Sequence, residues 1–249
     1  MFLGIPVLNR LDLLGRCLDY VDQPGEIVVV NNNSVEPAFG AGLARLAARR
    51  GFEVQNQERN LGVAASWNLL IRTAMARGHS MVVIGSNDTF LFPGSLQTVL
   101  TMDKGEAEVI WHIRGWNFFV FDTRAVERVG WFDENFYPAY DEDEDYAYRC
   151  DLAGAVRSWS ELESVGAKHL GSQTIRSDAE YARLNRFTHQ QWNARYYFAK
   201  WGGPPQAEVH RSPFGRPDRD WRWWPDPGLS LAERDWDQAR RERGARVNR

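Results

Sequence analysis

Five consecutive acidic residues, Asp141 to Asp145, are the part of this 249-residue chain with the clearest capacity for chemistry. Carboxylates this close repel one another, which raises the proton affinity of at least one of them. A carboxylate in that state can act as a general base or bind a cation. Acidic residues also suit the positive end of a helix dipole, so a solvated helix start is the alternative, above all for Asp141 and Glu144.

The alternation of Asp141, Asp143 and Asp145 resembles the start of a calcium-binding loop, but the rest of the pattern is missing. Such a loop needs glycine at its sixth position and a bidentate glutamate at its twelfth. These positions hold Tyr146 and Leu152. The acidic run therefore needs a different role.

Polar residues also follow each apolar run in the first half of the chain. Short β-branched runs alternate there with helical patterns, which is typical of βαβ units around a mostly parallel sheet. We expect strands at 2–5, 26–30, 52–55 and 80–84, and helices at 11–20, 37–50 and 62–77. The polar ends of these strands are Asn9, 31–34, 56–60 and 86–88. Because ligands bind beyond the carboxyl ends of strands in open α/β sheets, the four ends are expected to meet at one crevice.

The second half predicts fewer strands and a Trp-rich tail. We expect strands at 108–112 and 117–121, and helices at 123–129, 141–153, 177–200 and 230–243. After residue 200 the composition shifts to Trp, Pro, Arg and Asp. We therefore expect one α/β domain over 1–200, and an extension over 201–249 that packs on it and has a disordered end. Trp201, Trp221, Trp223, Trp224 and Trp236 either anchor this extension or grip a saccharide.

Composition narrows the class of protein. With 30 basic and 33 acidic residues and no basic stripe interleaved with aromatic residues before the tail, nucleic acid is not an expected partner. Cys17 and Cys150 have neither metal-type spacing nor a disulfide framework, so both are expected to be buried thiols in a reducing compartment. No stretch of eighteen apolar residues occurs and the first apolar run is too short for a signal peptide, so we expect a cytoplasmic protein without a membrane span.

Six segments occur in an informative order: 5–10, 26–34, 60–68, 86–88, 130–134 and 142–145. In that order they resemble the motifs of the family-2-type glycosyltransferases of the GT-A fold. Each motif alone is a weak signal, but six in sequence over roughly residues 1–200 are a specific one. The resemblance implies a GT-A-like, mostly parallel sheet flanked by helices. It also implies an inverting enzyme that moves a sugar from a nucleoside-diphosphate sugar to an acceptor hydroxyl.

The resemblance assigns roles to residues of this chain. Asp143 is expected to be the general base that takes the proton of the acceptor hydroxyl. Contacts with the acceptor or the sugar are expected from Trp116, Asn117, Glu142 and Asp145. Nucleotide contacts are expected from Pro6, Asn9, Asn31, Asn32, Asn60, Gly62, Asn68 and Asn87. A Mn²⁺ or Mg²⁺ ion is expected on Asp88 and His169, and the imidazole favours Mn²⁺.

Two departures from the family pattern matter for chemistry. Amides stand at Asn31 and Asn32, where acidic residues are usual. An Asn carbonyl can still accept the imide N–H of uracil or thymine, which favours a UDP- or dTDP-sugar. Ser86 replaces the first carboxylate of the metal motif, so Asp88, the diphosphate and water would share the ion.

Two other functions stay open. The lost carboxylate and the Trp-rich tail suit a catalytically silent protein that binds glycans or nucleotides. A sugar-nucleotide pyrophosphorylase would share the sheet, but it needs a Gly-rich, basic phosphate loop near the N-terminus, and residues 6–16 are not one. The acceptor can be a saccharide, a lipid-linked glycan or a protein, and a homo-oligomer is possible.

Overall fold

The computed structural model describes residues 1–22, 25–34, 38–159, 165–222 and 236–247. The chain forms two compact units: residues 1–60, 66–125 and 155–174 make the first, and residues 61–65, 126–154 and 175–249 make the second. Neither unit begins or ends at residue 200. The domain boundary expected there stays a prediction. In the described ranges, no helix is both long and apolar enough to cross a lipid bilayer.

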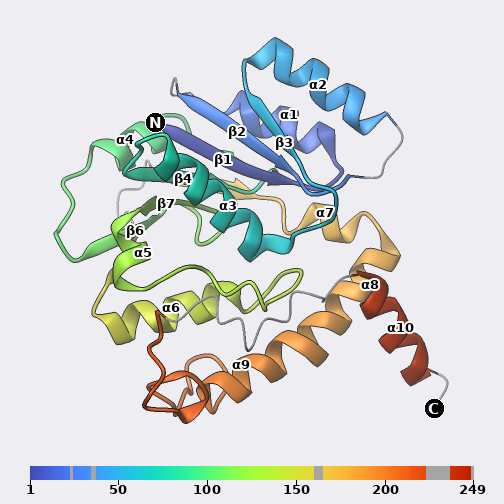
Figure 1. The fold of residues 1–249 in the computed structure, drawn as a ribbon. Coiled ribbons are helices and arrows are strands. Elements are labelled where there is room, and N and C mark those ends of the chain that lie inside the picture. Colours follow the sequence, from blue (N-terminus) through green and yellow to red (C-terminus); the bar gives the residue numbers. More distant parts are fainter. Residues whose placement is uncertain (23–24, 35–37, 160–164, 223–235, 248–249) are drawn as a thin grey trace. The chain divides into compact units, whose positions relative to one another are not determined.

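A seven-stranded sheet forms the centre of the first unit, with the strand order β3-β2-β1-β4-β7-β6-β8 among the described residues (Figure 1). Strands β1 to β4 run parallel, β7 runs antiparallel between β4 and β6, and β8 is parallel to β6. We call the side on which β1 to β4, β6 and β8 end the carboxyl edge. The strands are β1 (Phe2–Val7), β2 (Glu26–Asn31), β3 (Glu53–Asn56), β4 (Met81–Gly85), β6 (Glu108–His112), β7 (Phe118–Asp122) and β8 (Val156–Trp159).

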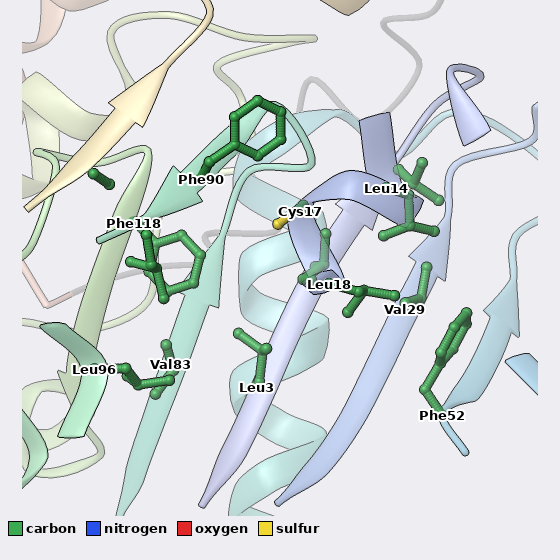
Figure 2. Close-up of a cluster of buried hydrophobic side chains, with 14 of the residues drawn as sticks. Leu3, Leu14, Cys17, Leu18, Val29, Phe52, Val83, Phe90, Leu96 and Phe118 are labelled. Atoms are coloured by element: carbon green, nitrogen blue, oxygen red, sulfur yellow. The ribbon is translucent and has the colours of Figure 1, made fainter. Parts of the chain in front are cut away.

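Alternating side chains of β1 explain how helices cover both faces of this sheet. Leu3 belongs to the same buried cluster as Leu14 and Leu18, so this face lies under α1 (Figure 2). On the other face, a Cβ on Gly4 would lie 2.8 Å from the side chain of Leu70, so the glycine lets α3 approach closely. Burying each such leucine stabilises the unit by about 1.5–3 kcal/mol. The helices are α1 (Leu11–Asp19), α2 (Phe39–Arg50), α3 (Gly62–Ala76) and α4 (Ser95–Thr101).

Both cysteines are free and buried, as predicted. Cys17 lies in the cluster of Figure 2, and burial, with the charge of Asp88 as a second cause, raises the pKa of its thiol to about 12.

Short elements account for most differences from the predicted pattern. The predicted strands and helices of the first half are present, with ends that shift by one or two residues. A separate antiparallel pair, β5 (Thr89–Leu91) with β9 (Ala167–His169), was not predicted, nor were α4, β8 and α7 (Gln173–Arg176). Elements of three to seven residues carry too few residues to show a clear period, and their partners elsewhere in the chain stabilise them.

The second unit is helical among its described residues. Its elements include α6 (Glu142–Ala153), α8 (Ala179–Thr188), a π-helical turn η1 (His189–Asn193), α9 (Ala194–Trp201), a 3₁₀ turn η2 (Pro213–Gly215) and α10 (Trp236–Val247). The short helix α5 (Arg124–Arg128) precedes them. Asp178 caps α8 by accepting hydrogen bonds from the N–H groups of Glu180 and Tyr181. The single helix predicted over 177–200 is therefore interrupted by a π turn, a feature that often marks functional sites.

The tail beyond α9 packs within the second unit. Trp201 is completely buried with Phe136 and Tyr197, and the partly buried Trp221 packs against the same cluster. Tyr148 on α6 donates from its hydroxyl to the carbonyl of His210 at 2.9 Å. These contacts support the anchoring role predicted for the tail's tryptophans. Trp223, Trp224, the side chain of Trp236, residues 230–235 of the predicted helix and the end at 248–249 lie outside the described residues.

Candidate functional site

An amide cluster lies at the carboxyl edge of β1, β2 and β3. Asn31 donates from Nδ2 to Oδ1 of Asn56 at 2.9 Å, and its Oδ1 accepts from the backbone N–H of Ser34 at 3.1 Å. The backbone N–H of Asn9 donates to Oγ of the same Ser34 at 2.8 Å. Three of the four predicted polar strand ends therefore meet at one place.

Four other nucleotide candidates of the first unit lie on or next to β1, β2 and α3. Asn32 is bonded through its amide to Oγ of Ser66 on α3, with Nδ2 to Oγ at 2.9 Å, and Asn68 is completely buried on the same helix. Pro6 lies on β1 beyond the last pair with β4, at Gly4, so its missing N–H breaks no bond to that strand. Asn60 is half-buried just before α3.

Asp88 sits at the tip that follows β4, in contact with residues from three segments. Its Oδ1 accepts from Ser86 Oγ at 2.6 Å and lies 3.1 Å from Nε2 of His169. Its Oδ2 accepts from the backbone N–H of Gln173 at 2.9 Å. Burial opposes ionisation of this carboxyl, but the bonds from His169, Ser86 and Gln173 outweigh it and bring the pKa of Asp88 down to about 2. Asp88 is therefore a carboxylate at any physiological pH.

The pairing of β5 with β9 explains why Asp88 meets His169. Thr89 is the register partner of His169, so the residue before Thr89 is held beside the imidazole. The backbone N–H of Leu170 also donates to the carbonyl of Asp88 at 3.1 Å. Both residues predicted to hold the metal ion are thus brought together by backbone pairing.

The donors at this tip fit a divalent cation that takes further ligands from a bound substrate. One carboxylate and one imidazole supply oxygen and nitrogen, the set that Mn²⁺ accepts. Among the described residues no group of three or more His, Cys, Asp or Glu side chains could hold a metal ion. Nδ2 of Asn87 is buried without a hydrogen-bond partner, so the tip also presents an unused donor. Substrate oxygens and water would complete the coordination.

Trp116 and Asn117 lie next to this tip. The backbone N–H of Ser86 donates to the carbonyl of Asn117 at 2.8 Å, which joins the end of β4 to the turn between β6 and β7. The ring of Trp116 packs edge-on against Phe119 at 5.1 Å and against His112 at 4.8 Å. The structure thus brings two of the predicted sugar contacts to the predicted metal tip.

Gly62 belongs to the second unit and has a structural reason to be glycine. Its φ is +79°, and a Cβ would lie 2.9 Å from the carbonyl oxygen of Pro138. The next backbone N–H, of Val63, donates to that same oxygen at 2.7 Å. The close approach of two backbones accounts for this glycine without a ligand.

The acidic run begins α6, as predicted. Burial, then the charges of Glu144 and Asp141, raise the pKa of Asp143 to about 6. Burial and the charge of Asp143 raise the pKa of Glu142 well above its usual value. Oε2 of Glu142 and Oδ2 of Asp141 are buried without hydrogen-bond partners. Asp143 with this pKa is ionised near pH 7 and keeps the basicity that a general base needs.

The π turn η1 holds the loop in front of α6. Nδ2 of Asn193 donates to the carbonyls of Ala139 and Tyr140 at 2.8 and 3.0 Å. His189, from the same turn, places Nε2 3.6 Å from Oδ1 of Asp141, and this contact raises the pKa of His189. Tyr140 and Asp141 both have left-handed backbones, with φ of 78° and 71°. Sequence reasoning missed His189 and Asn193, and nothing local in a helical stretch identifies them.

Asp145 lies in a buried ion network. Its Oδ2 is 2.7 Å from Nη2 of Arg149, and its Oδ1 is 2.6 Å from Nζ of Lys200 and accepts from Nε1 of Trp201 at 2.8 Å. Lys200 also lies 2.7 Å from Oδ2 of Asp133. Asp145 is completely buried. Burial opposes its ionisation, but Arg149 and Lys200 outweigh burial and lower its pKa. Cations and an indole thus occupy both oxygens of a residue that was expected to contact the acceptor.

Comparison with known proteins identifies the family to which this chain belongs. The model of "Glycosyl transferase family 2" matches residues 3–150. A galactofuranosyl glycosyltransferase from Leishmania donovani is 30% identical over 96 aligned residues, which cover 33% of this chain and 22% of that protein. The chain therefore spans well under two thirds of this relative.

Solved structures share the fold. The mannosyltransferase PcManGT from Pyrobaculum calidifontis, in complex with GDP-Man and Mn²⁺, has a TM-score of 0.58 and 17% identity, covering 78% of this chain and 62% of that one. Residues 1–349 of TarS from S. aureus give a TM-score of 0.50 and 13% identity, covering 80% of this chain and 69% of that one. These likenesses confirm the predicted GT-A-like sheet.

Proposed function

Because the chain belongs to glycosyl transferase family 2, we propose that it transfers a sugar from a nucleoside-diphosphate sugar to an acceptor hydroxyl. The observation that carries this proposal is the Asp88 tip. An ionised carboxylate, an imidazole and an unpaired amide stand together at the carboxyl edge, where α/β sheets bind ligands. Asp88 and His169 would hold Mn²⁺ or Mg²⁺, which when bound neutralises charge on the departing diphosphate.

The nucleoside is assigned to the amide cluster beside that tip. Asn31 and Asn32 are fixed by hydrogen bonds to Asn56 and Ser66, so their remaining donor and acceptor positions are preorganised. An amide carbonyl can accept the imide N–H of uracil or thymine, which favours UDP- or dTDP-sugars. GDP-mannose, the donor in the Pyrobaculum complex, belongs in the same test panel.

Asp143 is assigned the role of general base. A pKa of about 6 leaves it ionised at neutral pH while it keeps enough basicity to take a hydroxyl proton. The acceptor oxygen would then attack the anomeric carbon opposite the diphosphate, so the product would have inverted configuration. Burial raises the pKa of Glu142 and so favours its protonated form, which would donate a hydrogen bond to the acceptor. Both oxygens of Asp145 are engaged by cations of the chain. We therefore propose that Asp145 holds α6 in position and does not contact the acceptor.

The test measures transfer and binding separately. Wild-type protein is assayed with Mn²⁺ and a panel of UDP-, dTDP- and GDP-sugars, and nucleotide binding is followed by calorimetry. Asp143→Asn should lower transfer about 10²–10⁴-fold and keep nucleotide affinity. Asp151→Asn, which changes an exposed acid on the same helix, is the matched control. An Asp143→Asn protein that keeps wild-type turnover would remove Asp143 from the mechanism.

A catalytically silent binding protein is the second candidate. It is favoured by the single carboxylate of the metal tip, whose two oxygens already have partners in the chain. This version predicts that nucleotides bind and that neither transfer nor hydrolysis of any donor in the panel occurs.

A further inference from the structure

An exposed aromatic platform lies at the carboxyl edge of the first unit, apart from the amide cluster. We define it as Trp116, His112 and Trp159. The ring of Trp159 lies 4.6 Å from that of His112 at an interplanar angle of 33°, and the rings of His112 and Trp116 are 4.8 Å apart, edge to face. Trp159 is 61% exposed, whereas His112 is 2% exposed. A large ring held against a buried neighbour and open to solvent is a prepared binding surface.

The middle ring of the platform is neutral. Burial lowers the pKa of His112 to about 4, despite a contact with the backbone of Gly115 that acts in the opposite direction. An uncharged imidazole supports the indole of Trp159 as an apolar ring. A Cβ on Gly115 would meet Trp159 only at ordinary contact distance, 3.5 Å, so the turn fits closely under the indole. The exposed indole of Trp159 is therefore backed by an uncharged aromatic ring.

The strand register fixes the position of the platform. His112 ends β6 and is the register partner of Trp159, which ends the parallel strand β8. Trp116 lies in the turn whose Asn117 carbonyl accepts from Ser86, two residues before Asp88. Along the carboxyl edge, the order is therefore the amide cluster on β3, β2 and β1, then the Asp88 tip after β4, then the platform at β7, β6 and β8. If the nucleoside binds the amide cluster and the diphosphate binds at Asp88, the platform is free to bind a different substrate group.

We propose that the platform binds the acceptor, and that the acceptor is a saccharide of at least two sugar rings. The proposal rests on the proposed transferase function. The C–H face of a pyranose carries slight positive charge and packs on the electron-rich face of an indole. Trp116, next to the Asp88 tip, takes the ring that receives the sugar, and Trp159, one ring further out, takes the next. Arg114, exposed in the same turn, borders the platform with hydrogen-bond donors for ring hydroxyls.

The experiment uses the full chain and defined probes. Maltose, cellobiose, lactose and α-1,6-mannobiose, with their monosaccharides, are titrated at millimolar concentration and followed by saturation-transfer NMR. At least one disaccharide should bind the wild type more tightly than its monosaccharides. Trp159→Ala should weaken that disaccharide about tenfold, and Trp159→Phe should recover most of the loss because it keeps a ring. Because Trp159 is exposed, these variants are expected to fold normally, and circular dichroism checks this.

Controls separate this proposal from the transferase itself. Tyr20→Ala removes another exposed ring of the first unit, stacked on Phe90 at 5.4 Å, and should leave disaccharide binding unchanged. UDP, dTDP and GDP titrations with Mn²⁺ should be the same in wild type and Trp159→Ala. If Trp159→Ala does not change disaccharide affinity, or if the wild type binds no disaccharide, the platform proposal is wrong. Neither result contradicts the proposed transferase function. Loss of nucleotide binding in Trp159→Ala overturns the platform proposal too, because the ring would then hold the base. Failure of all nucleotides to bind the wild type instead contradicts the transferase.

Discussion

His169 holds its Nε2 3.1 Å from Oδ1 of Asp88, although the two residues come from chain segments that no local pattern connects. The antiparallel pair β5 and β9 makes this contact, with Thr89 opposite His169. The pair thus assembles one oxygen and one nitrogen donor beside a strand end that faces the ligand edge of the sheet.

If this pair holds the divalent ion, His169→Ala should weaken Mn²⁺-dependent nucleotide binding about 10–100-fold. Binding without metal should change little, because the amide cluster is untouched. Calorimetric titrations of UDP, dTDP and GDP with and without Mn²⁺ measure both quantities. His79→Ala is the matched control, since His79 pairs with Glu26 at 3.0 Å and precedes β4, whereas the tip follows the other end of that strand. An unaltered Mn²⁺ dependence in His169→Ala would show that the imidazole only supports Asp88.

The raised pKa of Asp143 predicts the pH dependence of transfer. A general base works in its ionised form, so the rate should be level above pH 7 and fall as the pH drops through about 6. Glu144 is exposed, and its charge is one of the causes of the raised pKa of Asp143. Glu144→Gln should therefore move the fall in rate to lower pH without removing it. The measurement is kcat/KM between pH 4.5 and 8.5 at saturating Mn²⁺, and a profile with no step near pH 6 would contradict the assignment.

Sequence patterns predicted the parts of the site that depend on strand ends. The strand pattern over 26–30 and the amides after it were enough to place Asn31 at the carboxyl edge, because strand direction fixes which end of a parallel strand faces the ligand. Asp88 followed from the same argument. What the sequence could not supply was the partner of each side chain, such as Asn56 for Asn31 or Gln173 for Asp88.

The missed features depend on contacts between distant segments. The helical pattern over 177–200 carries no sign of the π turn. In the structure, Asn193 of this turn donates hydrogen bonds to the carbonyls of Ala139 and Tyr140. Asp145 resembled a ligand-binding acid because the sequence cannot show that Lys200 and Trp201 reach it. Local patterns report period and charge, whereas burial of a charged group is a property of the assembled fold.

Gly62 gives a test of stability that is independent of function. Gly62→Ala should lower the free energy of unfolding by about 1–3 kcal/mol, because its φ of +79° strains an alanine and the new Cβ would lie 2.9 Å from the Pro138 carbonyl. Gly78→Ala is the matched control, with a φ of +80° and nothing within 4 Å of the added Cβ. Urea denaturation of both variants separates the cost of the backbone conformation from that of the close approach. Equal losses would show that the approach to Pro138 is relaxed at no cost.

Substitution of Lys200 tests how much the buried ion network of the second unit contributes to the free energy of unfolding. Its Nζ lies 2.7 Å from Asp133 and 2.6 Å from Asp145, and all three side chains are buried. Lys200→Met removes the shared cation and leaves Asp133 without a charged partner among the described contacts, while Arg149 still pairs with Asp145. The expected loss is about 3–5 kcal/mol in the free energy of unfolding, the usual cost of an uncompensated buried charge. Lys168→Met, at an exposed position of β9, should change stability by no more than about 0.5 kcal/mol. Denaturant unfolding at pH 7 measures both, and a Lys200→Met protein as stable as Lys168→Met would show that the network contributes no net stability.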